Sequence, residues 1–208
     1  MSGETMPARP DAPAGPARRS GRRLLPTLIV AGVLLVTAFG GFVAARALPQ
    51  TTARPLTLGD ILTTRPLPGW SVARRQPVSL PTFGGPVNGE FAQLTRGAGG
   101  LDLLAFPDLG GSPEDLAVLY RDGVLAHQLE RLAVSRNPER VMLGNGLEGV
   151  RFHYIGSTPG TGAAIEGTVT VVVSPSGNGA VFDGWAFQGQ FELLAEELAE
   201  MVVGAEVA

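Results

Sequence analysis

The chain has 208 residues and a formal net charge of −3, a length that suits one folded domain with accessory segments. It contains no cysteine, which excludes disulfides, thiolate nucleophiles, thiolate metal sites and lipidated cysteines. The charge is divided unevenly: residues 1–23 hold five arginines against two acids, whereas 9 arginines face 17 acids from residue 55 onward. Because an acidic domain repels the phosphate backbone, we expect no nucleic-acid partner.

Residues 1–23 have almost no apolar periodicity, so the sequence predicts a disordered tail. The prolines at positions 7, 10, 13 and 16 recur every third residue, which lines them along one edge of a polyproline II helix. Such an edge can dock in an aromatic groove. The same pattern suits a solvated leader in a Pro/Ala-rich chain, and we favour this second interpretation.

A transmembrane helix is predicted over residues 24–46. Leu24–Ala45 carries no charge, and at about 1.5 Å per residue its 22 residues reach roughly 33 Å, enough to cross a hydrocarbon core of about 30 Å. Arginines crowd its N-terminal end, so the positive-inside rule keeps the tail in the cytoplasm. The predicted location is the cell membrane, with a single pass, a linker at 47–55 and an extracytoplasmic domain at 56–208.

The alternative is a cleaved signal peptide, since Ala45-Arg46-Ala47 has the small-x-small form of a cleavage site. The apolar stretch is longer than a usual signal h-region, and Arg46 stands inside the site itself. We therefore favour a retained anchor, with cleavage after Ala47 as the open alternative.

Short strands separated by Gly/Pro turns are predicted at the start of the exported domain. Trp70–Arg74 has the character of a strand, and the proline- and glycine-rich stretch Gln76–Gly89 predicts a loop. Phe91–Arg96 and Leu101–Phe106 predict a hairpin that turns at Gly97–Gly100.

An amphipathic helix is predicted to begin at Ser112 and to end near Glu130. Ser112 is a preferred N-cap residue, and Pro113 suits the first helical position. Apolar residues follow at helical spacing and predict one continuous buried face. This stripe comprises Leu116, Leu119, Tyr120, Gly123, Val124 and His127.

Antiparallel strands and a second helix complete the predicted domain. The predicted strands are Arg131–Ser135, Arg140–Leu143, Leu147–Ile155, Ala164–Ser174 and Ala180–Gln188. Gln190–Val203 predicts a docked helix with one apolar face, whose glutamates at 192, 196, 197 and 200 stay in water. The order of elements predicts the α+β class, with an antiparallel β-sheet covered by two helices.

The order of motifs along this domain is distinctive. Leu67-Pro68-Gly69-Trp70 opens it, a Ser-Pro-Glu-Asp-Leu-Ala helix start follows at Ser112, and Leu143–Gly149 precedes a valine-rich strand. A Gly-rich turn, an aromatic strand and a terminal helix with Met201 complete the pattern. This order resembles the PsbP-like fold family, including its LpqN-like extracytoplasmic domains, over about residues 55–208. The resemblance implies an α/β/α sandwich and a binding or assembly role, with a membrane helix here in place of a lipidated cysteine.

No pattern predicts a catalytic residue, a cofactor site or a metal site. His127 and His153 lie 26 residues apart, with neither cysteine nor the H-E-x-x-H spacing of a zinc site. We expect His127 to pack on the helix stripe and His153 to hold an ordinary strand position. Trp70 and Trp185 are expected as core anchors rather than as the lining of a cleft. Ser174 lacks the flanking glycines of a nucleophile elbow.

These features predict a single-pass membrane protein that presents a non-enzymatic binding or assembly domain to a protein or another component of the cell envelope. The alternative is an extracytoplasmic carrier of a small apolar or lipid-like ligand, held in a cleft between helix and sheet. A third class is a hydrolase that uses serine or acid residues.

Overall fold

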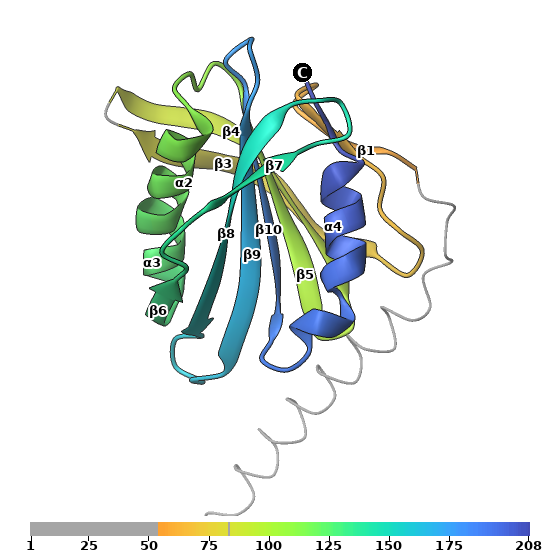
Figure 1. Cartoon of the computed structure of the whole chain (residues 1–208), viewed down its shortest axis with the longest axis vertical. Coiled ribbons are helices and arrows are strands. Elements are labelled where there is room, and N and C mark those ends of the chain that lie inside the picture. The colour runs from red at the N-terminus through yellow and green to blue at the C-terminus, as the bar shows by residue number, and fades with distance from the viewer. Residues whose placement is uncertain (1–53, 83) are drawn as a thin grey trace, which may run out of the picture. The chain divides into compact units, whose positions relative to one another are not determined.

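The computed structural model of the chain describes residues 54–82 and 84–208 (Figure 1). The predicted tail at 1–23, the predicted membrane helix at 24–46 and most of the predicted linker at 47–55 lie outside these residues. These described residues belong to one compact unit. Over the described ranges, no helix combines the length and the apolar character needed to cross a membrane.

An eight-stranded antiparallel sheet forms the centre of the described domain. Its strands are β3 (Ser71–Thr82), β4 (Gly85–Arg96), β5 (Gly99–Phe106), β6 (Glu130–Val134), β7 (Glu139–Met142), β8 (Glu148–Ser157), β9 (Ala164–Val173) and β10 (Gly179–Phe187). They lie in the order β3-β4-β5-β10-β9-β8-β6, with β7 paired to β8. Helix α2 (Pro113–Tyr120) and helix α4 (Ala195–Val203) lie on opposite sides of this sheet (Figure 1).

Each face of the sheet packs into its own hydrophobic cluster. On one face, Tyr120 of α2 packs with Val169 and Val171 of β9. On the other face, Leu198 of α4 packs in the cluster that contains Val172. Because successive strand residues point to opposite faces, a strand in the middle of this sandwich is buried on both sides. The predicted α+β class, with two helices covering an antiparallel sheet, is confirmed for the described residues.

Most of the predicted strands are present. Those expected at 131–135, 140–143, 147–155, 164–174 and 180–188 correspond to β6, β7, β8, β9 and β10, with their ends shifted by one or two residues. The predicted hairpin at 91–106 corresponds to β4 and β5, which turn at Gly97 and Ala98.

A second sheet, of three short strands, was not expected from the sequence. It consists of β1 (Leu56–Leu58), β2 (Leu62–Thr64) and β11 (Glu206–Val207), in the order β1-β2-β11. Leu58 and Val207 are buried in the same hydrophobic cluster as α4. Strands of two or three residues are too short to show a hydrophobic period, which is why the sequence pattern did not predict them.

The prediction of a loop at 76–89 is wrong, because this stretch is the outer part of a long hairpin. β3 and β4 pair along their length as far as Thr82 opposite Gly85. Proline is compatible with β3 because this strand is the edge of the sheet and has a neighbour on one side only. Pro77 and Pro81 suggested a turn in the sequence, but both lie within strand β3.

The first predicted helix is interrupted after Tyr120. A π-helical turn, η1 (Arg121–Leu125), follows α2 and leads into the short helix α3 (Ala126–Gln128). A π-helical turn holds more residues than an α-helical one, so it rotates the buried face of everything beyond it. Leu125 is buried as a result, and His127 is exposed. The expectation that His127 packs on the helix stripe is wrong for this reason.

The last helix is shorter than the predicted Gln190–Val203, because the 3-10 turn η2 (Phe191–Leu193) precedes α4. Its glutamates do not all stay in water. Glu197 is half-buried, accepts a hydrogen bond of 2.7 Å from the indole Nε1 of Trp70, and pairs with Arg96. Trp70 itself is 8% exposed, which confirms it as a core anchor.

Candidate functional site

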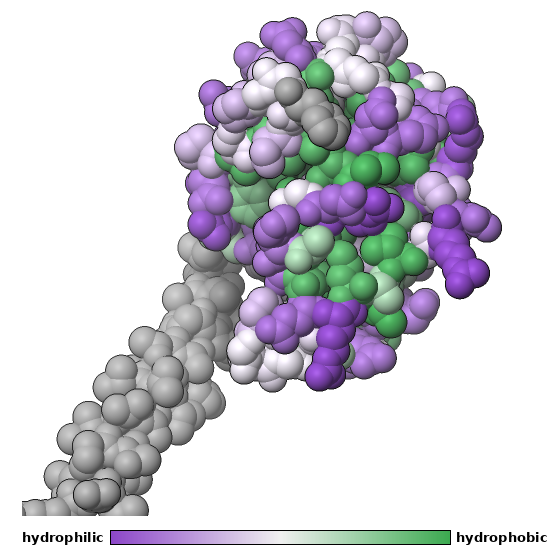
Figure 2. Space-filling view, turned by 90° about the vertical axis from the view of Figure 1, so that its left-hand side faces the viewer, coloured by the Kyte–Doolittle hydropathy of each residue, from purple (hydrophilic) through white to green (hydrophobic). Residues whose placement is uncertain are grey.

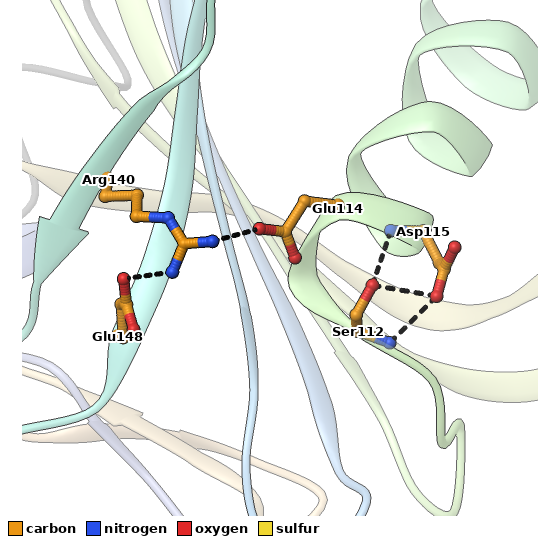
Figure 3. Close-up of polar contacts among 5 residues, drawn as sticks. All are labelled: Ser112, Glu114, Asp115, Arg140 and Glu148. Carbon is orange, nitrogen blue, oxygen red and sulfur yellow. Dashed lines mark hydrogen bonds and ion pairs between the residues drawn. The ribbon is translucent and has the colours of Figure 1, made fainter.

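The first turn of α2 is held in place by its own cap and by a bridge to the sheet (Figure 3). The backbone N–H of Asp115 donates to Ser112 Oγ at 3.1 Å, and the backbone N–H and hydroxyl of Ser112 donate to the Asp115 carboxylate at 3.1 and 2.8 Å. Arg140 of β7 joins Glu114 of α2 at 3.2 Å and Glu148 of β8 at 2.6 Å. The predicted N-cap at Ser112 is therefore present, and it fixes where α2 begins above the sheet.

A groove of about 460 Å³ lies between α2, the loop that precedes it and the tip of the β3–β4 hairpin. Its surface is mainly apolar, and its lining includes the glycines Gly84, Gly110, Gly111 and Gly123. The apolar lining consists of Leu109, Leu116, Val118 and Leu119. The volume falls within the range of about 300–1,000 Å³ that is usual for ligand sites in proteins.

Two acids border the groove, and both already have partners within the protein. The hydrogen bonds from Ser112 lower the pKa of Asp115. Asp122 accepts hydrogen bonds of 2.6 and 2.9 Å from the Arg121 guanidinium, and these lower its pKa. Both carboxylates are therefore ionised near neutral pH and held by their neighbours. They form a charged, polar edge beside the apolar groove.

The face of the domain that carries α2 exposes hydrophobic surface on both sides of a hydrophilic band (Figure 2). Val118 contributes to it, since 50% of this residue is exposed, and Leu119 is partly exposed beside it. Covering apolar surface is favourable by about 25 cal/mol per Å². Covering the apolar surface of this face would therefore be energetically favourable.

A carboxyl group is fully buried beneath α2. Asp183 of β10 is 3% exposed, and its oxygens accept hydrogen bonds of 2.8 Å from the hydroxyls of Tyr120 and Tyr154. Burial raises the pKa of Asp183 to about 7, with a further contribution from the charge of Asp102, while the two tyrosine hydrogen bonds act against the rise. The pKa of both tyrosines is raised, first by burial and then by the charge of Asp183.

A polar row leads from this buried carboxyl towards the edge of the sheet. Asp183 lies directly across from Asp102 of β5, which lies across from Gln93 of β4, which lies across from Arg74 of β3. Gln93 Nε2 donates to the Asp102 carboxylate at 2.8 Å. Burial raises the pKa of Asp102, although this hydrogen bond and the neighbouring Trp185 and Arg74 side chains lower it. Asp183 can therefore hold a proton near neutral pH, because burial and the charge of Asp102 both disfavour its ionised form.

A buried acid with a raised pKa does not by itself identify a catalytic group. A perturbed acid pair is a feature of many active sites, yet structural networks perturb pKa values in the same way. Here the donors around Asp183 are tyrosine hydroxyls whose own pKa values are raised, so they are poor sources of a nucleophile. In the part of the chain that the structure describes, no three His, Cys, Asp or Glu side chains gather as a metal site would require.

The other residues singled out from the sequence are dispersed. Trp185 is partly buried against the α2-side cluster, as expected of a core residue, and it also contacts the Asp102 carboxylate. His153 stands on β8, on the face opposite α2, and its Nδ1 lies 2.8 Å from Thr168 Oγ1. His127, on α3, belongs neither to the lining of the α2 groove nor to the polar row of Asp183 and Asp102.

Sequence reasoning missed the two aspartates. Asp183 interrupts the otherwise apolar run Ala180–Ala186, and an acid inside such a run was the available signal of a buried, bonded carboxyl. Its pairing with Asp102 depends on strand register, which the sequence pattern does not specify.

Comparisons with known proteins give a likeness of fold only. No protein-family model matches the chain, and a comparison with curated proteins finds no match. Solved structures do match. The chain is similar to cyanobacterial PsbP from Synechocystis, with 9% identity over 78% of this chain and 96% of that one and a TM-score of 0.48.

Two further solved structures are similar. LpqN of Mycobacterium tuberculosis, described as involved in cell envelope biogenesis, has 15% identity over 75% of this chain and 85% of its own, with a TM-score of 0.45. A protein of unknown function from Pseudomonas aeruginosa has 12% identity over 73% of this chain and 94% of its own, with a TM-score of 0.39. The resemblance to PsbP and LpqN that the sequence motifs indicated is confirmed as a similarity of fold.

Proposed function

We propose that this protein is a non-enzymatic binding domain, held at the outer side of a membrane by a single N-terminal helix, and that its α2 groove receives an apolar side chain of a protein partner in the envelope. The observation that carries the proposal is the groove of about 460 Å³, with its lining of leucine and valine side chains beside a firmly capped helix.

The structure of the groove favours a protein partner over a free small molecule. Val118 stands at its edge with 50% of its surface exposed, so a small ligand in the groove would remain partly in water. A protein partner would cover both the groove and the hydrophobic surface that this face of the domain exposes (Figure 2). Interfaces of this kind place one or two large apolar anchors in a pocket and surround them with polar contacts.

The membrane part of the proposal is supported by the sequence. Leu24–Ala45 has the length and composition of a bilayer-spanning helix, and arginines precede it. The domain that follows is acidic from residue 55 onward, which disfavours contact with anionic lipid and leaves protein as the more suitable partner.

Site-specific photo-cross-linking of the full-length chain in cells tests the groove. A photoreactive residue at Leu119, inside the groove, is expected to give a protein adduct. The same residue at Leu193, which is 73% exposed beside α4, is the matched control and is expected to give none. Adding Val118→Asp should abolish the adduct, because a charge at the edge of the groove opposes apolar docking. Equal adducts at both positions, or an adduct that survives Val118→Asp, would refute the proposal.

A second candidate function is an extracytoplasmic carrier of a small apolar ligand, favoured by the volume of the same groove. Native mass spectrometry of the full-length chain released from detergent separates the two. A bound mass of lipid size that disappears in Val118→Asp supports the carrier, whereas the bare mass together with a protein cross-link supports the binding domain.

A further inference from the structure

A second hollow lies on the opposite face of the sheet from the α2 groove. It has a volume of about 140 Å³ and is enclosed by α4 on one side and by β8, β9 and β10 on the other. Its walls differ in chemistry: leucine, valine, alanine and phenylalanine come from α4, η2 and β5, while polar side chains come from β8 and β9.

Strand register builds the polar wall. Arg151 and His153 alternate along β8, and each lies directly across from a threonine of β9, Thr170 and Thr168 respectively. Arg151 Nε donates to Thr170 Oγ1 at 3.2 Å, and His153 Nδ1 lies 2.8 Å from Thr168 Oγ1. Both side chains are therefore oriented by neighbours on the adjacent strand before any ligand arrives.

The guanidinium of Arg151 retains donors for a ligand. Its bond to Thr170 uses Nε, which leaves the two terminal amino groups, and no carboxylate oxygen among the described residues lies within 4.0 Å of it. Glu139, its cross-strand neighbour on β7, instead lies 4.0 Å from His153 Nε2. A half-buried arginine with spare donors beside an apolar wall is a suitable seat for a planar anion.

The apolar wall limits the size of what the arginine can hold. Leu198 and Phe191 line it together with the small residues Ala195 and Ala199. A Cβ added to Gly184 would meet Leu198 at 3.1 Å, so α4 lies close against β10 at this point. The volume of about 140 Å³ is close to that of an engineered apolar cavity of about 150 Å³ that binds benzene. The space against this wall therefore suits a short hydrocarbon group.

Charge then selects between carboxylate and phosphate. Arg151 is one fixed positive charge, and the domain around it carries 17 acids against 9 arginines from residue 55 onward. Glu196 and Glu200, on the exposed side of α4, contribute to this excess of negative charge. The attraction of a ligand to this arginine doubles between a monoanion and a dianion, whereas the cost of taking the ion out of water rises with the square of its charge, so the site favours the monoanion.

We propose that this hollow is a binding site for a short monocarboxylate, with its carboxylate on Arg151 and the threonine hydroxyls, and its hydrocarbon part against Leu198 and Phe191. The site is independent of the α2 groove, since no residue lines both.

Ligand-observed saturation-transfer NMR tests this with the full-length chain in detergent micelles, after subtraction of the signal from empty micelles. The probes are 3-methylbutanoate, its neutral amide 3-methylbutanamide, and inorganic phosphate in competition. We expect the carboxylate to bind and phosphate not to displace it. The amide should bind at least about tenfold more weakly than the carboxylate, because one charge-assisted hydrogen bond is worth about this factor.

Variants locate the site. Arg151→Gln should weaken 3-methylbutanoate by about tenfold or more, and Arg140→Gln, an exposed arginine on the neighbouring strand β7, should leave it unchanged. Ala199→Leu keeps every polar group and fills the hollow from α4, so it should abolish binding. Equal affinity for acid and amide, displacement by phosphate, unchanged binding in Arg151→Gln or Ala199→Leu, or no saturation transfer at millimolar carboxylate would each overturn the proposal.

Discussion

Two tyrosine hydroxyls and one neighbouring carboxylate act in opposite directions on the proton of Asp183. The hydrogen bonds from Tyr120 and Tyr154 favour the carboxylate, whereas burial and the charge of Asp102 favour the neutral acid and prevail. With a pKa of about 7 in the folded domain and an ordinary value of 3.8, Asp183 keeps a proton that the unfolded chain has already released between these two values. The stability contribution of this proton is complete below pH 3.8 and is lost as the pH rises through about 7.

We therefore predict that the free energy of unfolding falls as the pH is raised from 5 to 8, by up to about 1.4 kcal/mol per pH unit for one proton. Asp183→Asn should remove much of this fall, because an amide cannot ionise and can still hydrogen-bond both tyrosines. Urea unfolding of the full-length chain at both pH values measures the effect. Glu192→Gln, an exposed acid on η2, is the matched control and should follow the wild type. An Asp183→Asn profile parallel to the wild type would contradict the assignment.

Gly167 is a second residue whose effect can be predicted. It lies across from Tyr154 of β8 and Trp185 of β10, and a Cβ built on it would stand 2.6 Å from the Tyr154 hydroxyl and 2.7 Å from the Gly184 carbonyl oxygen. Gly167→Ala should destabilise the domain by about 1–3 kcal/mol, because the clash displaces backbone and a buried tyrosine. Gly123→Ala is the control, since nothing lies within 4 Å of the added carbon. Thermal unfolding of both variants compares them, and equal midpoints would show that the sheet adapts freely.

At the scale of elements, helix α2 depends on its first turn more than on its length. It has eight residues before the π-helical turn, too few to be stable alone, so capping and packing must hold it. The Ser112–Asp115 box satisfies backbone donors that would otherwise be unpaired (Figure 3). Since α2 also forms one wall of the groove, loosening this turn should affect binding as well as stability.

Ser112→Ala is predicted to cost about 1 kcal/mol of stability. It should also weaken the protein cross-link formed from Leu119, because the start of α2 is no longer fixed beside the groove. Ser79→Ala, at an exposed position of β3, should change neither measurement. Chemical denaturation and cross-linking yield test the two effects separately, and an unchanged yield in a destabilised Ser112→Ala variant would mean that the cap supports the fold alone.

The elements differ in how far the sequence could predict them, for physical reasons. β9 was predictable because its valines and threonines alternate with period two, and the terminal helix because its apolar residues repeat with a helical period. The hairpin at β3 was not, because proline at an edge strand resembles proline in a loop. The π-helical turn was not, because it adds a residue without changing composition. The Arg151 hollow needs both strand register and the placement of α4, neither of which a local pattern contains.

At the scale of the whole molecule, the proposed orientation places residues 1–23 in the cytoplasm and the sandwich outside. The chain has no cysteine, so single cysteines can report on each side without a background. We predict that a membrane-impermeant maleimide labels Ser79→Cys in sealed cells and labels Ser20→Cys only after the membrane is opened with detergent. Gel mobility shows at once whether the product retains residue 20, as a retained anchor requires. Labelling of Ser20→Cys in sealed cells would reverse the orientation.

If the domain is tethered as we propose, the three-stranded sheet has a mechanical consequence. The chain enters the described domain at β1, which is paired with β2, and β2 is paired in turn with β11 from the far end of the chain. Tension applied through the tether therefore acts first on a three-residue strand that has no ladder to the eight-stranded sheet. Because Leu58 and Val207 of this sheet are buried in one hydrophobic cluster with Leu198 of α4, load on β1 would be passed to the helix that forms one wall of the hollow.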